Sequence, residues 1–175
     1  RVFGEGIGLC VKFSQGQPQK DLALLKDLGV RWVRDHSSWA RMEPVPGRYE
    51  LGAALRERLA FYRANNIGVI FCLAYDNRVA YPPTPEDPHR NLDPRAFGRY
   101  VAATARLLRE SGVRFVLELW NEPHNFVLRK QLGGPWHGGP PCPWLDHYVR
   151  MVREAVKQVK AVDPVIKVLS DEDCT

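Results

Sequence analysis

The sequence of 175 residues lacks any apolar run near the roughly 20 residues that a helix needs to span a bilayer, so we expect no membrane span. It also lacks a Cys-x-x-Cys pair, because its four cysteines stand far apart, and this argues against a structural zinc site. No glycine-rich phosphate turn follows any of the expected strands. We therefore expect neither a metal nor a nucleotide cofactor.

An excess of positive charge is present, with a formal net charge of +5. The basic residues are spread along the chain, and several recur at helical spacing among Leu, Ala and Val. This pattern is typical of the solvated faces of amphipathic helices, and no nucleic-acid-binding motif accompanies it. We therefore expect no nucleic-acid partner.

Short apolar runs alternate with longer amphipathic ones. The apolar runs predict strands over 6–13, 30–36, 68–75, 113–120 and 165–170. The amphipathic runs predict helices over 19–29, 51–66, 93–112 and 144–163. The third helix has a clear start signal, with Asp93 as N-cap and Pro94 at its first position.

The expected strands are apolar on both faces, which is typical of a parallel sheet covered by helices. Such alternation gives either a doubly wound sheet or a (β/α)8 barrel. The polar residues cluster just after strand ends, and in a barrel these ends share one mouth. This favours an α/β fold that is the N-terminal part, about five strands, of a TIM barrel. Because a closed barrel has eight strands, we expect residues 1–175 to be one partial domain of a longer chain.

Two carboxylates mark the fourth expected strand. Glu118 and Glu122 share one side of it by alternation, with Glu122 nearer the mouth and Glu118 deeper. A buried carboxylate is costly unless it is paired. Arg34, near the end of the second expected strand, is the natural partner for one of the two, and we expect Glu118 to form a structural ion pair.

The segment "ELWNEP" (118–123) resembles the strand-four motif of the clan A glycoside hydrolases, which are (β/α)8 barrels. Three further stretches resemble the segments of that clan around its second and third strands: 24–50, 71–82 and 97–108. Within the clan, the likeness is greatest to glycoside hydrolase family 39 and related endo-acting enzymes on polysaccharides.

The resemblance implies a retaining glycosidase, a hydrolase of O-glycosidic bonds in a poly- or oligosaccharide. It assigns Glu122 as the general acid/base, Asn121 as a contact to the sugar 2-hydroxyl, and Arg34 as a positioning residue for the nucleophile. In the clan, the nucleophile is a Glu at the end of the seventh strand, which this chain does not reach. We therefore expect residues 1–175 alone to be inactive.

Further side chains near the strand ends are candidates for binding carbohydrate, because sugars stack on aromatic rings and bond to polar groups. These candidates are His36, Trp39, Asp76, Asn77, Trp120, His124 and Trp136. Trp136 lies in a Gly- and Pro-rich stretch, 132–144, that we expect to form a loop contacting substrate. The histidine spacings match no metal-ligand motif.

Two alternatives stay open. An inactive, carbohydrate-binding homologue would keep the cleft without the second carboxylate. An unrelated barrel enzyme would instead show a catalytic Lys or a phosphate-binding loop at a strand end, and neither is evident. Enzymes that act on polysaccharides are often exported, which favours an extracellular location.

Overall fold

The computed structural model describes residues 8–124 and 127–170. Its five strands form one parallel sheet in the order β1-β2-β3-β4-β5. The strands are β1 (Gly8–Cys10), β2 (Trp32–His36), β3 (Gly68–Leu73), β4 (Phe115–Leu119) and β5 (Val168–Ser170). The α-helices are α1 (Leu22–Asp27), α2 (Trp39–Met42), α3 (Ala53–Ala64), α4 (Pro94–Ser111), α5 (Val127–Leu132) and α6 (Pro143–Val162). Short 3-10 helices are η1 (Phe13–Gln15), η2 (Gln19–Asp21) and η3 (Arg90–Leu92).

The expected α/β architecture is confirmed, since every predicted strand and helix has its counterpart in the structure. The first strand is shorter than predicted, because the chain turns into η1 at Phe13 instead of continuing the sheet. Residues 6 and 7 of that prediction lie outside the described residues. Two helices were not predicted, α2 and α5, which are too short for a helical period to show in the sequence.

The predicted cap of α4 is also confirmed. The Asp93 carboxylate accepts a hydrogen bond of 2.6 Å from the backbone N–H of Ala96, and Pro94 begins the helix. This bond satisfies one of the amides that a helix start leaves without a partner. The long helix that it starts forms the backing of the sheet.

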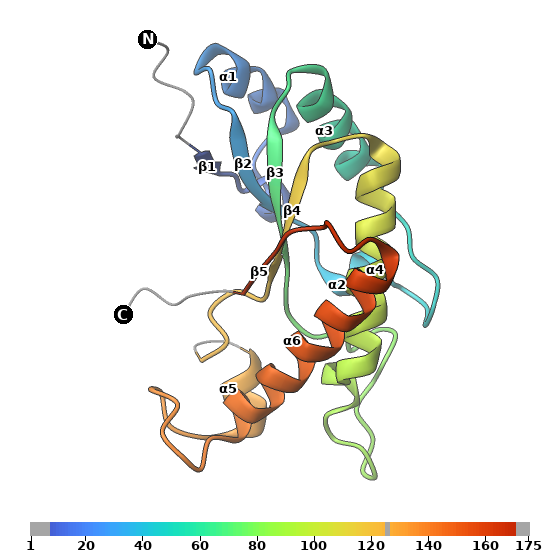
Figure 1. Ribbon diagram of the computed structural model, residues 1–175, viewed down its shortest axis with the longest axis vertical. Helices are drawn as coiled ribbons and strands as arrows, with labels where there is room; N and C mark the ends of the chain where they lie inside the picture. Colours follow the sequence, from blue (N-terminus) through green and yellow to red (C-terminus); the bar gives the residue numbers. More distant parts are fainter. Residues whose placement is uncertain (1–7, 125–126, 171–175) are drawn as a thin grey trace.

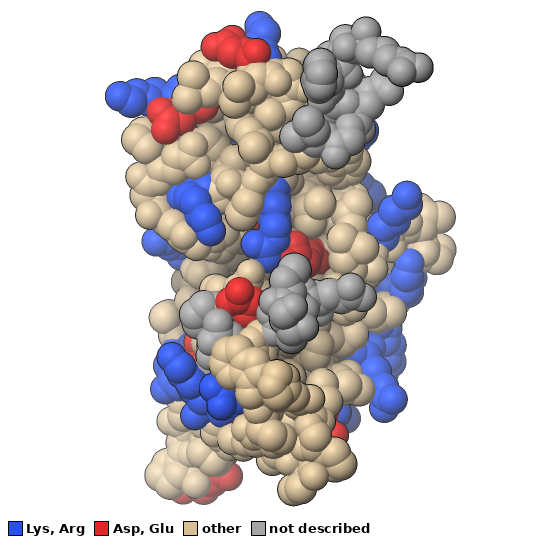
Figure 2. All heavy atoms as spheres, turned by 90° about the vertical axis from the view of Figure 1, so that its left-hand side faces the viewer, with Lys and Arg blue, Asp and Glu red and all other residues tan. Residues whose placement is uncertain are grey.

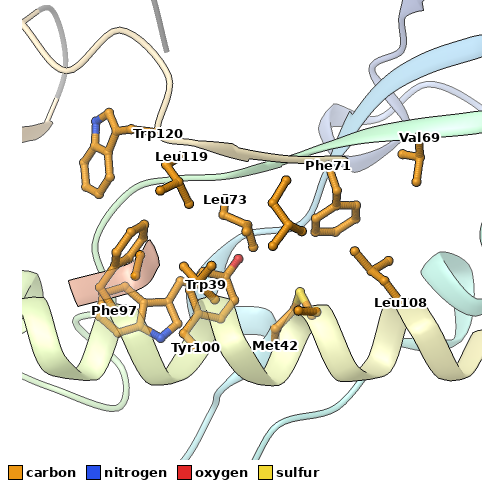
Figure 3. Close-up of a cluster of buried hydrophobic side chains, with 14 of the residues drawn as sticks. Trp39, Met42, Val69, Phe71, Leu73, Phe97, Tyr100, Leu108, Leu119 and Trp120 are labelled. Carbon is orange, nitrogen blue, oxygen red and sulfur yellow. The ribbon is translucent and has the colours of Figure 1, made fainter. Parts of the chain in front are cut away.

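One face of the sheet packs on helices, with α3, α4 and α6 lying along the same side (Figure 1). Phe71 and Leu73 of β3 are fully buried and point toward α4, Leu73 near Tyr100 and Phe71 on the side of Leu108 (Figure 3). Trp39 joins this core, with its ring stacked on that of Tyr100 at 5.4 Å. The apolar contact between β3, β4 and α4 fixes the positions at which these strands end.

Alternation along β2 sends charged side chains to both faces of the sheet. Asp35 points to the helix side, where Arg58 Nε donates to it at 2.8 Å and the Tyr62 hydroxyl at 3.0 Å. Arg34 and His36 point to the opposite face. None of the helices within the described ranges combines the length and the apolar character needed to cross a membrane.

We predict that Arg58→Met destabilises the protein by about 3–5 kcal/mol, because it leaves the buried Asp35 carboxylate without its cation. Arg58 and Asp35 are 3% and 1% exposed, so water cannot replace the lost partner. The measurement is the free energy of unfolding in urea at neutral pH. Arg56→Met, at an exposed position of the same helix, is the matched control. A loss no greater than that of the control would contradict the prediction.

Candidate active site

A pocket of about 370 Å³ lies where β1, β2, β3 and β4 end. Its lining includes Lys12, Arg34, His36, Tyr75, Asn121 and Glu122. These residues are far apart in the sequence and meet because parallel strands place their carboxyl ends at one edge. The pocket therefore gathers four of the residues that the sequence marked: Arg34, His36, Asn121 and Glu122.

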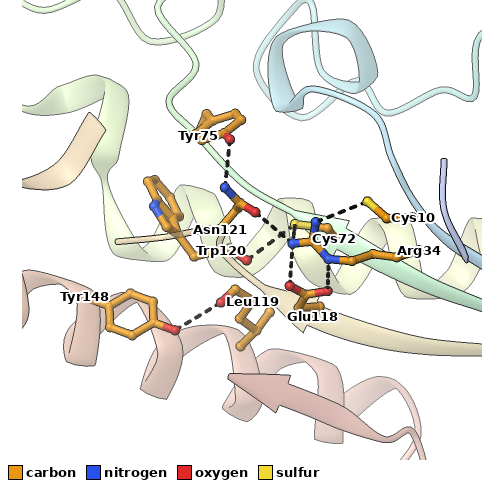
Figure 4. Close-up of polar contacts among 9 residues, drawn as sticks. All are labelled: Cys10, Arg34, Cys72, Tyr75, Glu118, Leu119, Trp120, Asn121 and Tyr148. Atoms are coloured by element: carbon orange, nitrogen blue, oxygen red, sulfur yellow. Dashed lines mark hydrogen bonds and ion pairs between the residues drawn. The ribbon is translucent and has the colours of Figure 1, made fainter. Parts of the chain in front are cut away.

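Arg34 and Glu118 form a two-pronged ion pair across the open face of the sheet. Nε of Arg34 donates to one carboxylate oxygen of Glu118 at 2.7 Å, and Nη2 donates to the other at 2.6 Å (Figure 4). The expected ion pair of Glu118 is confirmed. Its hydrogen bonds raise the pKa of Arg34 further above its usual value. Both oxygens of Glu118 are therefore engaged by one rigid guanidinium group.

The same guanidinium group also orients Asn121. Nη2 of Arg34 donates to Oδ1 of Asn121 at 2.8 Å, and Nδ2 of Asn121 donates to the Tyr75 hydroxyl at 3.1 Å. The Asn121 amide is thus held from both ends (Figure 4). Among the described residues, Tyr75 is the acceptor for Nδ2, and the second N–H can serve as a donor for a ligand.

The backbone around the pocket takes an uncommon conformation. Tyr75, Trp120 and Glu122 have φ angles of 73°, 78° and 47°, values that side-chain-bearing residues rarely adopt. A hydrogen bond holds Trp120 in place, because its backbone N–H donates to the Leu73 carbonyl at 2.8 Å. Such strained residues concentrate at functional sites. Here the turn directly after β4 places Asn121 and Glu122 in the pocket wall.

His36 lies half-buried in the pocket with the Ser14 hydroxyl 2.9 Å from Nε2. Burial is the main cause that lowers the pKa of His36, and the positive charges of Arg34 and Lys12 lower it further. The negative charge of Asp35 acts against these effects and raises the pKa of His36. The imidazole ring is therefore neutral at physiological pH and offers one donor and one acceptor.

Three of the predicted sugar-binding residues are instead enclosed by protein. Trp39, Asn77 and Trp120 are each 0% exposed. The Trp39 ring packs in the core, and its indole N–H donates to the buried Glu43. Asn77 caps backbone N–H groups of Val79 and Ala80. None of the three presents a face to the pocket, because each fills a packing role.

Asp76 also lies outside the pocket lining. Its Oδ2 accepts hydrogen bonds from Arg78, Asn91 and Gln131 at 2.6–3.0 Å. These contacts tie the loop after β3 to η3 and α5. Asp76 thus fixes loops around the mouth instead of facing the pocket.

His124 and Trp136 form a separate cluster beyond β4. Their rings meet edge to face at 4.2 Å, and the Arg129 guanidinium lies 4.8 Å from the centre of the Trp136 ring. Trp136 remains 40% exposed, so part of its ring is available to a ligand. The stretch that carries Trp136 is anchored, since the indole N–H of Trp144 donates to the Pro135 carbonyl at 2.8 Å.

Several pocket residues were not among the predicted site residues. Cys10, the last residue of β1, and Lys12, just beyond it, both line the pocket. Cys72 lies in β3 and Tyr75 follows this strand by two residues, and the available signal was an aromatic residue at the end of the expected strand 68–75. Within the described ranges, no group of three or more His, Cys, Asp or Glu side chains is arranged to hold a metal ion.

Known proteins that match this chain bear on its resemblance to the clan A glycoside hydrolases. The profile of a glycoside hydrolase family described as β-galactosidase, family 42, matches residues 12–85. Among curated proteins, no sequence matches the chain. A solved family 39 glycoside hydrolase from Bacteroides cellulosilyticus superimposes with a TM-score of 0.65 at 23% identity, covering 93% of this chain and 30% of that one. The fold is that of the N-terminal part of a TIM barrel, as found in this solved glycoside hydrolase.

Other solved glycoside hydrolases agree. A rutinosidase from Aspergillus niger gives a TM-score of 0.58 at 18% identity, covering 89% of this chain and 47% of its own. An endoglucanase from Pseudomonas stutzeri, solved with cellobiose, gives a TM-score of 0.57 at 16% identity, covering 86% of this chain and 40% of its own. The resemblance to barrel glycoside hydrolases is thereby confirmed. The chain spans less than half the length of these structures.

We predict that the His36 ring titrates with a midpoint below its ordinary pKa of 6.5, because burial penalises the charged ring. The unfolded chain then binds the proton more readily than the folded one. The stabilisation that His36 contributes is therefore complete above pH 6.5 and lost as the pH falls through the folded pKa. The measurement is an NMR titration of the ring, with His36→Gln to assign its signal. A midpoint at or above 6.5 would contradict the prediction.

Proposed function

We propose that the protein is a retaining glycoside hydrolase in which Glu122 is the general acid/base. The observation that carries the proposal is the position of Glu122, directly after β4, in the wall of a pocket that also contains the doubly held Asn121. The match to a β-galactosidase family and the likeness to glycosidase structures support a sugar substrate. We propose a β-linked poly- or oligosaccharide.

A retaining glycosidase needs two carboxyl groups about 5–5.5 Å apart. One protonates the leaving oxygen and later removes a proton from water. The other attacks the anomeric carbon and forms a covalent glycosyl-enzyme. In this proposal, Glu122 performs the first role. Hydrogen bonds to the sugar 2-hydroxyl that strengthen in the transition state assist the reaction, and the remaining N–H of Asn121 is suited to make one.

The second carboxylate has to come from elsewhere. Both carboxylate oxygens of Glu118 accept hydrogen bonds from Arg34. Asp35 accepts hydrogen bonds from the side chains of Arg58 and Tyr62 and from the backbone N–H of His36. A nucleophile must present a lone pair to the substrate, so neither carboxylate is suited to the role. We propose that residues 1–175 are one part of the catalytic domain and that a strand outside β1–β5 carries the nucleophile. Arg34 would help to position it.

A second candidate function is carbohydrate binding without hydrolysis. The observation that favours it is the engagement of Glu118 and Asp35 by arginines, which leaves Glu122 without an available second carboxylate in the described part of the pocket. A binding protein would retain the pocket and the exposed Trp136, yet its Glu122 would be dispensable. Hydrolysis assays separate the two functions.

We predict that Glu122→Gln in the full-length protein lowers kcat/KM by about 100- to 10,000-fold, the usual contribution of a general acid/base. The glutamine keeps the shape of the side chain and cannot exchange a proton. Glu110→Gln, at an exposed position near the end of α4, is the control and should leave the rate unchanged.

The same assay, followed by NMR, gives the configuration of the first-formed sugar. We predict retention of the anomeric configuration of the substrate. A fully active Glu122→Gln enzyme, or a product of inverted anomeric configuration, would contradict the proposal. Binding of a glycan without any hydrolysis by the wild-type protein would favour the second candidate.

A further inference from the structure

Positive charge dominates the β1 side of the pocket. Lys12 lines the pocket just beyond β1, and Arg41 of α2 lies close by, with Nη1 donating to the Ser14 carbonyl at 3.3 Å. Both side chains belong to exposed residues. In the described part of the chain, neither Lys12 nor Arg41 forms an ion pair with a carboxylate.

Two other charged residues of the lining, Arg34 and Asp35, are paired with oppositely charged side chains. Arg34 is bound to Glu118, and Asp35 is bound to Arg58, so each pair carries no net charge. In the described part of the chain, no carboxylate lies within ion-pair distance of the Lys12 ammonium group, so no direct contact neutralises its charge. The positive charge of Lys12 is one of the smaller causes that lower the pKa of His36.

The wider surface carries more basic side chains. Figure 2 shows Lys and Arg groups distributed over one face of the molecule, with acidic side chains between them near its middle. The formal net charge of the chain is +5, so its overall field, which is screened over about 10 Å at 0.1 M salt, favours anionic ligands.

We infer that the sugar bound beside Lys12 carries a negative group, a carboxylate or a sulfate, that pairs with the Lys12 ammonium, with Arg41 at the rim. This inference rests on the proposed function and names the substrate class of the same pocket. An anionic sugar in this position would give the ammonium group a partner of opposite charge, and a neutral sugar would not. Lys12 is thus a specificity-determining residue, selective for anionic over neutral glycans.

The test uses the full-length protein with Glu122→Gln, which binds substrate without turning it over. The probes are β-linked oligosaccharides of glucose and of galactose, each in a neutral form, a form oxidised at C6 to the carboxylate, and a form sulfated at O6. Binding is measured by calorimetry at low and at high salt. We expect a charged form to bind about fivefold more tightly than its neutral parent, the effect of one partly exposed ion pair.

Lys12→Met should abolish this preference, and Lys20→Met, at an exposed position outside the pocket lining, should retain it. High salt should weaken the preference in the parent protein. A preference for the C6-oxidised form alone identifies a uronate, and one for the sulfated form alone identifies a sulfate ester. Equal or tighter binding of the neutral forms, a preference that survives Lys12→Met, or binding of no form would overturn the inference.

Failure of this inference is distinguishable from failure of the proposed function. Hydrolysis that depends on Glu122 but shows no charge preference overturns the inference alone. A Lys12-dependent charge preference without Glu122-dependent hydrolysis overturns the enzymatic role and leaves the anionic ligand in place.

Discussion

The guanidinium group of Arg34 connects three strand ends, and the geometry of the pocket depends on it. It extends from β2 across the open face of the sheet, takes both oxygens of Glu118 on β4, and also bonds to Asn121 after that strand. Its Nη2 lies 3.4 Å from the Cys72 sulfur on β3. A lysine could not reproduce this set of contacts, because its ammonium group is a point charge with three donors and lacks the planar fork that pairs with both oxygens of a carboxylate. The network therefore requires an arginine.

The turn after β4 stores conformational strain that this network stabilises. Trp120 and Glu122 both adopt positive φ angles, while the buried Trp120 ring packs against Phe97 at 5.7 Å. The tight packing of the ring and the fixed Asn121 amide hold the backbone in this conformation. A strained segment held from both sides keeps the neighbouring Glu122 in one place, as catalysis by positioning requires. Burial of Trp120 thus serves the site indirectly, without contact to a ligand.

Much of this architecture could be predicted from local patterns. The apolar runs located every strand, and Asp93 and Pro94 located the start of α4. The cost of burying a carboxylate predicted an ion pair for Glu118, and Arg34 was expected to pair with one of the two carboxylates of β4. Burial of individual aromatic side chains could not be predicted. A tryptophan after a strand end can either stack on a sugar or pack in the core. For Trp39, the packing of α2 against α4 places the ring in the core. Lys12 was missed because the apolar run hides the early end of β1.

The central claim, that Glu122 is the acid/base, is tested most directly by chemical rescue. The full-length Glu122→Ala protein would be assayed with a dinitrophenyl glycoside, whose leaving group needs no protonation, with and without sodium azide. Azide can enter the space left by the carboxyl group and attack the glycosyl-enzyme without a base. The account predicts faster turnover and a glycosyl azide of the same anomeric configuration as the substrate. An azide product of inverted configuration would make Glu122 the nucleophile, and no response to azide would contradict its acid/base role.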